Sequence, residues 1–371
     1  MFEDVVILLF LSSFILFRYS GTSIVTTKRI SHVHTHRQLT QTTSNWTKVN
    51  ANADWSARNF HISVIHNNKM YVIGGGGLND VWSSDNGGMN WTQVTAAADW
   101  SARSRQTGVV FYNKIYIMGG YSSSVYFNDV WSSDTGMNWD LVTDTAAWSG
   151  RHRHSSVAYD GKIYLMGGSD ASNQFLHDVW SSVDGVTWLE ATANAGWSAR
   201  FGQSSIVFNN SMYVIGGYYG AYIKDVWSST DGATWDLVTN SPSWAARRDY
   251  VAVAYNYKIY VICAYAATYL RDVWSSSDGG ITWDDITPST TQSDWTTRYG
   301  HSSVVTNNKL YILGGNYEVT PLNDIWVLDD SNMFPISNSN STTNTESILG
   351  ITWIGVHVGF VGLVAFKYLI N

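Results

Sequence analysis

Cysteine and charged residues are both scarce in this sequence, and each scarcity argues against a class of protein. Cys263 is the one cysteine among 371 residues, so no intrachain disulfide can form and a disulfide-rich secreted scaffold is excluded. Only 14% of the residues are charged, and the net charge is -7. Phosphate binding needs a basic footprint, so nucleic acid is not an expected partner. The 44% of hydrophobic residues are ample for a large core.

No sustained helical period is found between residues 45 and 330, and a repeat stands there instead. Its signature is Asp-Val-Trp-Ser-Ser, which occurs five times and once more in a degenerate form. The tryptophans of the six copies are Trp82, Trp131, Trp180, Trp227, Trp274 and Trp326. They are 49, 49, 47, 47 and 52 residues apart, which is typical of an array of supersecondary units.

Each unit contains four short apolar or alternating runs. In the third unit, residues 155–159 and 162–166 predict two strands joined by the turn Asp160-Gly161. A third strand is expected around Trp180 and a fourth around Trp188, after a second tight turn. Pairs of glycines end the second strand in five units, whereas Cys263-Ala264 takes that place in unit five. The pattern predicts an all-β, six-bladed β-propeller of four-stranded antiparallel blades over residues 45–330.

The repeat resembles a known family. Arg151, His154, Tyr164, the pair Gly167-Gly168 and Trp180 follow one another as in the kelch repeat. The turn from Ser276 to Trp283 also resembles an Asp-box. Kelch proteins are six- or seven-bladed propellers and most are binding modules, although galactose oxidase shows that the fold can hold an enzyme. The resemblance therefore implies the fold and leaves the activity open.

The sixth unit has no Asp-box turn and no fourth strand of its own after Trp326. The segment around Trp46 has the same form as the fourth strand around Trp91, and both precede a Trp-Ser-Ala-Arg sequence. We predict that residues 45–49 supply the outermost strand of the last blade and pair antiparallel with residues 324–328. Such pairing would close the ring and cover an otherwise open sheet edge.

The two ends of the sequence differ in composition from the repeat. Residues 1–23 contain a short apolar run and predict a signal peptide, with an uncleaved anchor as the alternative because acidic residues precede the run. Residues 24–44 predict a flexible leader, and residues 331–347 a linker rich in Ser, Asn and Thr. Residues 348–370 form an apolar tail that predicts either a GPI signal or a transmembrane helix. N-glycosylation acceptor patterns occur at Asn45, Asn90, Asn209 and Asn340.

The first candidate site is a ring of arginines, one per unit, each three residues after a tryptophan. They are Arg58, Arg103, Arg151, Arg200, Arg247 and Arg298. Such a ring could bind an anion or an acidic sugar. Alternatively, each arginine stacks on its tryptophan and hydrogen-bonds the next blade, because a residue that is repeated in every unit usually stabilises the fold of the unit.

His61, His154 and His301 follow three of these arginines and could bind a metal, because imidazole is a common metal ligand. Gln106, Gln203 and Tyr250 stand at the matching positions, and all of these side chains can cap backbone groups. Metal–imidazole bonds are only about 2 Å long, whereas a propeller channel is wide, so no metal is assigned.

The second candidate site is the face that carries the loops between second and third strands, which vary between units. Variable loops on a rigid scaffold are where binding usually resides, and aromatic residues beside arginines suit a protein or glycan partner. The alternative is that these aromatic side chains pack against their own blades. The aromatic loop residues are Tyr121, Tyr126, Phe127, Phe175, Tyr218, Tyr219, Tyr222, Tyr265, Tyr269 and Tyr317.

An enzymatic function has less support from the sequence. Only Glu190 and Glu318 among the four glutamates lie in the repeat, and a glycosidase needs a paired acid and base or nucleophile. Cys263 lies near Tyr260 and Tyr265, but a galactose-oxidase-like site would need a copper site and a Cys–Tyr crosslink, and this cysteine stands where a glycine pair belongs.

The most consistent interpretation is a monomeric propeller outside the cell, attached to the membrane by its C-terminal tail. It would bind an extracellular protein or a glycan through the variable-loop face, without catalysis and without a cofactor. The alternatives are an extracellular carbohydrate-active enzyme on the same fold and a purely structural coat protein.

Overall fold

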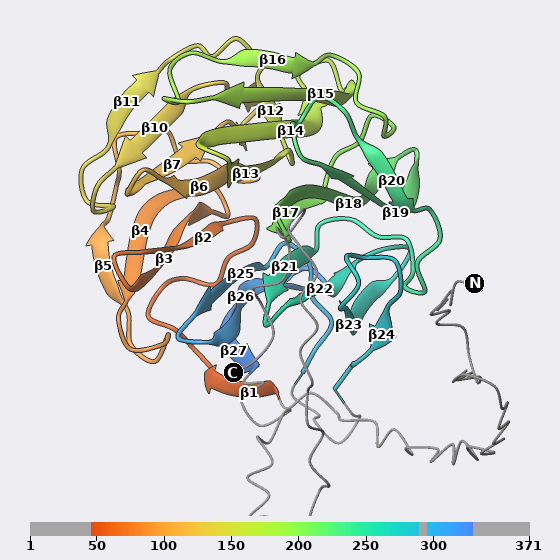
Figure 1. Ribbon diagram of the computed structural model, residues 1–371. Helices are drawn as coiled ribbons and strands as arrows, with labels where there is room; N and C mark the ends of the chain where they lie inside the picture. The colour runs from red at the N-terminus through yellow and green to blue at the C-terminus, as the bar shows by residue number, and fades with distance from the viewer. Residues whose placement is uncertain (1–45, 289–294, 329–371) are drawn as a thin grey trace, which may run out of the picture. The chain divides into compact units, whose positions relative to one another are not determined.

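The computed structural model describes residues 46–288 and 295–328, and every regular element within these ranges is a β-strand. Six sheets of four or five strands are arranged around a centre as the blades of a propeller, and two further strands form a small hairpin (Figure 1). The predicted all-β, six-bladed fold is confirmed. The predicted signal peptide, leader, linker and tail lie outside the described residues. Within those residues, no helix has the length and apolar character needed to cross a membrane.

The first three blades follow one another along the chain. Blade 1 consists of β2 (Ile62–His66), β3 (Lys69–Gly75), β4 (Leu78–Ser84) and β5 (Thr92–Thr95). Blade 2 consists of β6 (Thr107–Phe111), β7 (Lys114–Met118), β10 (Val130–Ser133) and β11 (Asp140–Thr143), with β8 (Tyr121–Ser122) and β9 (Val125–Tyr126) as a small hairpin in its loop. Blade 3 consists of β13 (Ser155–Tyr159), β14 (Lys162–Asp170), β15 (Phe175–Ser182) and β16 (Leu189–Thr192), and the two-residue β12 (Arg151–His152) also pairs with β14.

The remaining blades complete the circle. Blade 4 consists of β17 (Ser204–Phe208), β18 (Ser211–Tyr219), β19 (Ala221–Ser229) and β20 (Asp236–Thr239). Blade 5 consists of β21 (Val251–Tyr255), β22 (Lys258–Tyr265), β23 (Tyr269–Ser276) and β24 (Asp284–Asp285). Blade 6 consists of β25 (Ser302–Thr306), β26 (Lys309–Tyr317), β27 (Thr320–Leu328) and β1 (Trp46–Asn50).

The hydrophobic core lies between blades rather than within them. The second strand of each blade is buried on both faces, which explains the continuous apolar sequence of β14, whereas the outermost β16 is half-buried to exposed. One core, for example, combines Met118 and Val130 of blade 2 with Ile163, Leu165 and Trp188 of blade 3. Each blade therefore depends on its neighbour for the burial of its apolar surface.

Tryptophan pairs recur in these cores. Trp148, in the connection into blade 3, meets the Asp-box residue Trp188 edge to face, with ring centroids 5.9 Å apart. Blades 1, 2, 4 and 5 have equivalent pairs, which are Trp55–Trp91, Trp100–Trp139, Trp197–Trp235 and Trp244–Trp283. The Asp-box turns are also formed: in blade 3 the Asp184 carboxylate accepts hydrogen bonds from the backbone of Val186 and Thr187.

The chain closes the ring as predicted. β1 pairs antiparallel with β27, and Trp46 lies opposite Leu328. Trp46 stacks on Trp295 with ring centroids 4.8 Å apart, so it takes the place that an Asp-box tryptophan has in the other blades. The Lys48 ammonium group lies over the ring of Trp326, at 5.0 Å from its centroid.

The glycine pairs mark irregular points in the sheets: in blades 1, 3, 4 and 6 the second strand includes the pair, whereas β7 ends at Met118 before it. β14 continues through Gly167 and Gly168 to Asp170, with a shift in register between Met166 and Gly168. Gly168 has φ 100°, and a Cβ atom there would lie 2.8 Å from the Cβ atom of His154. In blade 5, Cys263 takes the place of Gly167 with a similar φ of 53°, and Ala264 takes the place of Gly168, which shows that small side chains can be accommodated there.

Candidate binding face and channel mouth

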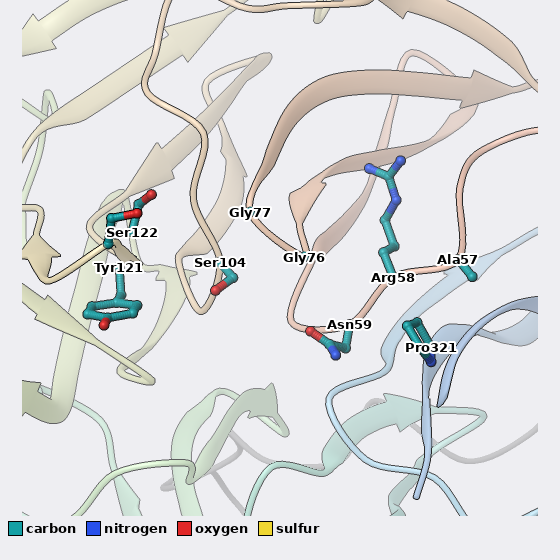
Figure 2. Close-up of a pocket in the computed structure, with 10 residues that line it drawn as sticks. Ala57, Arg58, Asn59, Gly76, Gly77, Ser104, Tyr121, Ser122 and Pro321 are labelled. Carbon is teal, nitrogen blue, oxygen red and sulfur yellow. The ribbon is translucent and has the colours of Figure 1, made fainter. Parts of the chain in front are cut away.

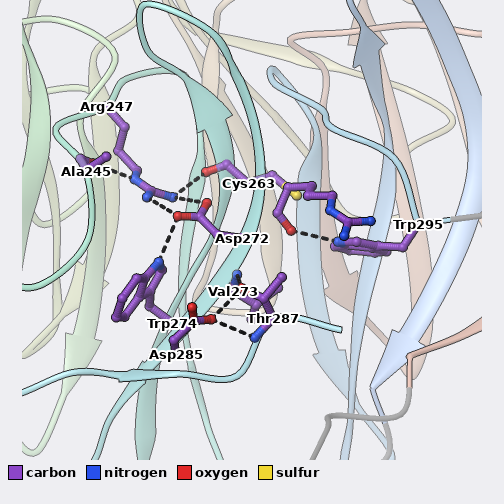
Figure 3. Close-up of polar contacts among 10 residues, drawn as sticks. Ala245, Arg247, Cys263, Asp272, Val273, Trp274, Asp285, Thr287 and Trp295 are labelled. Atoms are coloured by element: carbon purple, nitrogen blue, oxygen red, sulfur yellow. Dashed lines mark hydrogen bonds and ion pairs between the residues drawn. The ribbon is translucent and has the colours of Figure 1, made fainter. Parts of the chain in front are cut away.

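The six repeated arginines are buried, with exposed fractions of 0–1%. Each guanidinium group donates two hydrogen bonds to the aspartate of the Asp-Val-Trp-Ser-Ser segment in its own blade. In blade 1, Arg58 Nη1 and Nη2 lie 2.6 and 2.8 Å from the Asp80 oxygens, and Nη1 also donates to the carbonyl of Gly74. Trp82 Nε1 donates to the same carboxylate. Figure 3 shows the equivalent Arg247–Asp272–Trp274 group of blade 5.

This arrangement gives the arginines a structural role. Burial raises the pKa of Asp178, but the hydrogen bond and charge of Arg151 and the hydrogen bond from Trp180 outweigh it, so that the carboxyl pKa is lowered overall. The backbone N–H of Arg151 donates to Phe127 in the preceding blade, so each arginine segment joins two blades. A ligand would reach these guanidinium groups only by displacing the aspartates. The geometry thus favours the structural interpretation, and ligand contact by the six arginines stays a prediction.

The residues three positions later surround the centre of the ring. Gln106, Gln203 and Tyr250 each donate a side-chain hydrogen bond to a carbonyl of the preceding blade, as expected for backbone capping. His61 Nε2 lies 2.7 Å from Ser302 Oγ, and burial, with a smaller effect of Arg58, lowers the pKa of His61 to about 3. This imidazole is therefore neutral at physiological pH. Residues 46–288 and 295–328 contain no group of three His, Cys, Asp or Glu side chains that could hold a metal ion.

The residue immediately before each of these six belongs to a closed ring of backbone hydrogen bonds. The six members, called the mouth ring here, are Phe60, Arg105, Arg153, Gly202, Asp249 and Gly300. Each of their N–H groups donates to the carbonyl of the member in the preceding blade, over 2.7–3.1 Å. The ring borders a small cavity of about 130 Å³, which the histidine and glutamine side chains also line. The mouth ring thus fixes the positions of four side chains, those of Phe60, Arg105, Arg153 and Asp249, around the channel entrance.

All six members of the mouth ring have positive φ values. Glycine adopts this conformation freely, whereas other residues meet a steric cost of about 1 kcal/mol or more each. Phe60, Arg105, Arg153 and Asp249 nevertheless occupy four of the six places, with φ between 51° and 60°. Strained non-glycine residues concentrate at functional sites, so these four side chains are candidates for function.

Three arginines and two phenylalanines alternate across the mouth. The guanidinium carbons of Arg105 and Arg153 lie 4.8 and 5.3 Å from the ring centroid of Phe60. Those of Arg153 and Arg248 lie 5.0 and 5.1 Å from that of Phe201. These five residues are called the mouth cluster here. Cation–π contacts of this kind hold the guanidinium groups in place while leaving their N–H groups available to other acceptors.

One carboxylate, that of Asp249, accompanies the three arginines. Arg153 Nε lies 3.2 Å and Arg248 Nε 3.7 Å from its oxygens. Neither contact has hydrogen-bond geometry, and the buried Nε atoms of Arg105, Arg153 and Arg248 have no hydrogen-bond partner among the described residues. Burial lowers the pKa of Arg153; Asp249 opposes this effect, and the charges of Arg105 and Arg248 add to it. The mouth is therefore a crowded, positively charged site.

The predicted loop aromatics form an arc beside the mouth cluster. Phe175 contacts Phe201, and the series continues through Tyr218, Tyr222 and Tyr265 to Tyr299, with ring centroids 5.1–6.1 Å apart. Tyr269 stacks on Tyr299, and Tyr219 packs on Phe175. Most of these rings are half-buried, whereas Tyr219 is 55% and Tyr317 41% exposed. The arc thus combines mutual packing with exposed aromatic surface, and ligand binding by it stays a prediction.

Three other predicted residues lie in blade 2. Tyr121 and Tyr126 contact each other and His152, with centroids 5.1–5.6 Å apart. Phe127 instead lies beneath the structural Arg103, whose guanidinium carbon is 3.9 Å from its ring centroid. Phe127 therefore packs against a structural arginine of its own blade.

A notch interrupts the rim of the loop face at blade 1. β3 and β4 are joined there by Gly76 and Gly77, and only four residues separate Gly75 from Asp80, fewer than separate the matching positions in the other five blades. Figure 2 shows the resulting cavity of about 510 Å³, with Tyr121 of blade 2 on one side and Pro321 of blade 6 on the other. Asn59 and Ser104 line its inner end. Since these two residues immediately precede members of the mouth ring, the notch leads to the mouth.

Sequence reasoning missed the residues that form the mouth. Phe60, Arg105, Arg153 and Asp249 follow the repeated arginines by two positions, and Phe201, Arg248 and Tyr299 follow them by one. A signal was present, because these positions differ from unit to unit while the arginines before them do not change. Variation at a fixed structural position is typical of a functional surface on a repeat scaffold.

The residues relevant to catalysis or modification are dispersed. Burial raises the pKa of the Cys263 thiol to about 12, so the thiol is protonated and shielded. Glu190 lies on β16 of blade 3, whereas Glu318 lies in the turn between β26 and β27 of blade 6. Asn90 and Asn209 are exposed, as glycosylation would require, and Asn45 and Asn340 lie outside the described residues.

Comparison with known proteins agrees with this architecture. Residues 25–217 match the KLHDC2/KLHL20/DRC7 Kelch-repeats domain, and residues 297–332 match the Kelch motif. The first match alone covers more than half of the chain. A search of curated proteins finds no match.

Proposed function

The chain belongs to the kelch-repeat family of β-propellers, and we propose that it binds a partner protein on its loop face, around the channel mouth. Kelch propellers generally serve as protein-binding modules. The observation that carries the proposal here is the mouth cluster with its aromatic arc. Arginine and aromatic side chains dominate the binding energy of protein interfaces, and the mouth cluster and the arc bring both kinds together on the loop face.

The opposite face is built from more regular connections. Its connections are two-residue turns and Asp-box turns, whose backbone N–H groups are used by their own side chains, as in Asp231 with Ala233 and Thr234. These turns are short and repeat a common form, and among the described residues their exposed apolar side chains, such as Met89 and Tyr257, number at most two in a blade. The loop face, by contrast, differs at every blade.

Substitution of tyrosines in the arc tests this function. The double variant Tyr219→Ala/Tyr222→Ala removes part of the arc, and the variant Tyr257→Ala removes an 88% exposed tyrosine from the opposite face as a matched control. Proteins captured from the native source by the full chain are quantified by mass spectrometry. A specific partner should be lost by the double variant, by about tenfold or more, and retained by the control. Equal capture by all three proteins would refute docking on the loop face.

We also propose that the propeller is displayed outside the cell and attached to the membrane, which rests on the apolar segments at residues 1–23 and 348–370 and on the exposed acceptors Asn90 and Asn209. N-glycosidase treatment of the native protein should lower its mass. Release by phosphatidylinositol-specific phospholipase C would assign a lipid anchor, and retention would assign a transmembrane segment. An unchanged mass after N-glycosidase treatment would contradict the extracellular assignment.

The same face could also accept a glycan, because aromatic rings and guanidinium groups serve both ligand types. A glycan array probed with the full chain addresses this alternative. Turnover of carbohydrate substrates is not expected, since Glu190 and Glu318 belong to different blades and Cys263 is shielded.

A further inference from the structure

The mouth carries more positive than negative charge. The contacts described above bring together Arg105, Arg153 and Arg248 with a single carboxylate, that of Asp249. The nearby His152 adds no charge at neutral pH, because burial lowers its pKa to about 4. The cluster is therefore left with an excess of two positive charges.

The repeated arginines of the same chain show that this excess is unusual for the fold. Each of those is held by the aspartate of its own blade through two charge-assisted hydrogen bonds. The mouth arginines have no aspartate at an equivalent place, and their Nε atoms are buried without a hydrogen-bond partner among the described residues. Burying a guanidinium group without full pairing is unfavourable, so this arrangement is stabilised when an anion binds.

The positions of the three guanidinium groups are set before a ligand arrives. Phe60 lies between Arg105 and Arg153, and Phe201 lies between Arg153 and Arg248. The backbone of the mouth ring anchors the first two arginines directly. Binding therefore requires little ordering of side chains, which is the main cost of recruiting long cationic residues.

We infer that the channel mouth is a binding site for a compact group with two negative charges, carried by the partner protein. The charge excess of two matches a phosphoryl group, which carries about -1.5 to -2 at pH 7, or two adjacent carboxylates. The notch at blade 1 gives a polypeptide a polar route to this site, past Asn59 and Ser104. This inference rests on the proposed function, because it specifies what the protein partner presents to the mouth.

The test uses the full chain and three fluorescent peptide pools of the same length. One pool contains phosphoserine, one contains two adjacent glutamates at that position, and one contains serine. Saturable binding is expected for at least one dianionic pool and not for the serine pool. Whichever of the phosphoserine and diglutamate pools binds more tightly identifies the source of the charge. Inorganic phosphate should compete with the bound pool. Failure of both dianionic pools to bind would overturn the inference.

Variants show whether the mouth is responsible. Arg153→Ala should weaken binding at least tenfold, and Arg153→Lys should restore it only in part because lysine lacks the guanidinium fork. Asp249→Asn should strengthen binding several-fold, since it removes the competing carboxylate. Arg271→Ala, which removes the same charge from β23, is the matched control and should have no effect. Equal weakening by Arg271→Ala, or unchanged binding in both Arg153→Ala and Asp249→Asn, would overturn the site.

Arg248→Gln provides a second test if Arg153→Ala lowers the melting temperature, because Arg248 is not a member of the mouth ring.

The outcomes also separate this inference from the proposed function. If the tyrosine double variant loses a captured protein that Arg153→Ala retains, protein binding stands and the anion site fails. If peptides bind at the mouth but no protein is captured through the loop face, the proposed function fails instead.

Discussion

At the scale of single residues, arginine has two separate roles in this chain, and its partners distinguish them. Arg151 is enclosed and shares both Nη groups with Asp178, whereas Arg153, two residues later, lies between two phenylalanines with one partial counter-charge. The first kind stabilises a blade and the second leaves donors for a ligand. Replacing the neighbouring carboxylate should therefore have different consequences: loss of Asp178 should destabilise the fold, whereas loss of Asp249 should strengthen anion binding.

Asp178→Asn should destabilise the fold, because it leaves the Arg151 guanidinium buried with an incomplete partner. Breaking a buried ion pair from one side costs about 3–5 kcal/mol. Urea denaturation measures the loss, and Asp236→Asn on the exposed part of β20 is the control, with a change within about 0.5 kcal/mol. Equal stability of the two variants would show that the repeated arginines do not depend on their aspartates.

His61 should make the fold sensitive to acid. Its pKa is about 3 in the folded protein, because of burial and the Arg58 charge, and about 6.5 in an unfolded chain. As pH falls below about 6.5, the unfolded state binds a proton at His61 that the folded state does not. The free energy of unfolding therefore decreases with falling pH until the folded protein is also protonated, near pH 3. His61→Gln, which introduces the residue found at the matching positions 106 and 203, should flatten the decline of unfolding free energy between pH 6.5 and 4. Parallel pH profiles for the variant and the wild type would contradict this assignment.

At the scale of strands and loops, the repeat predicts regular elements better than their ends. The hairpin turns and the Asp-box turns determine where the first strands end and the fourth strands begin. The second and third strands extend further than their apolar patterns indicate, as in β14, because pairing continues beyond the glycine pair through the bulge. The clasp by β1 could be predicted because the segment around Trp46 repeats the form of the segment around Trp91.

The clasp can be tested by truncation. Deleting residues 24–49 removes most of β1, including Trp46 and its stack on Trp295, so the whole ring should lose stability, by about 3–5 kcal/mol for the buried tryptophan alone. Deleting residues 24–44 leaves β1 in place and should be nearly neutral. Melting temperatures of the two truncated proteins provide the measurement, and equal values would contradict a stabilising clasp.

At the scale of the whole molecule, the sequence predicts the scaffold but not the centre of the binding site. A period of about 47 residues with invariant tryptophans, arginines and aspartates is sufficient for six blades, since each repeated residue performs the same task six times. The mouth is different, because Phe60, Arg105, Arg153 and Asp249 come from distant parts of the sequence. They become neighbours only when the mouth ring of backbone hydrogen bonds forms. The repeat places these positions in one circle, and their variation between units is a signal, but which side chains contact one another there is seen only in the closed structure.

Closure also predicts how the molecule unfolds. An open array of repeats has terminal units that can unfold first, whereas here each core is shared by two blades and the clasp leaves no terminal blade. Trp148→Ala and Trp244→Ala remove buried tryptophans from two cores that have no residue in common. Each should cost about 3–5 kcal/mol, and both variants should still unfold in one transition with similar midpoints. The double variant should lose nearly the sum of the two, since separate sites are additive. Differential scanning calorimetry measures these quantities. Two resolved transitions in either single variant would mean that part of the ring is stable alone, and that closure does not couple the blades.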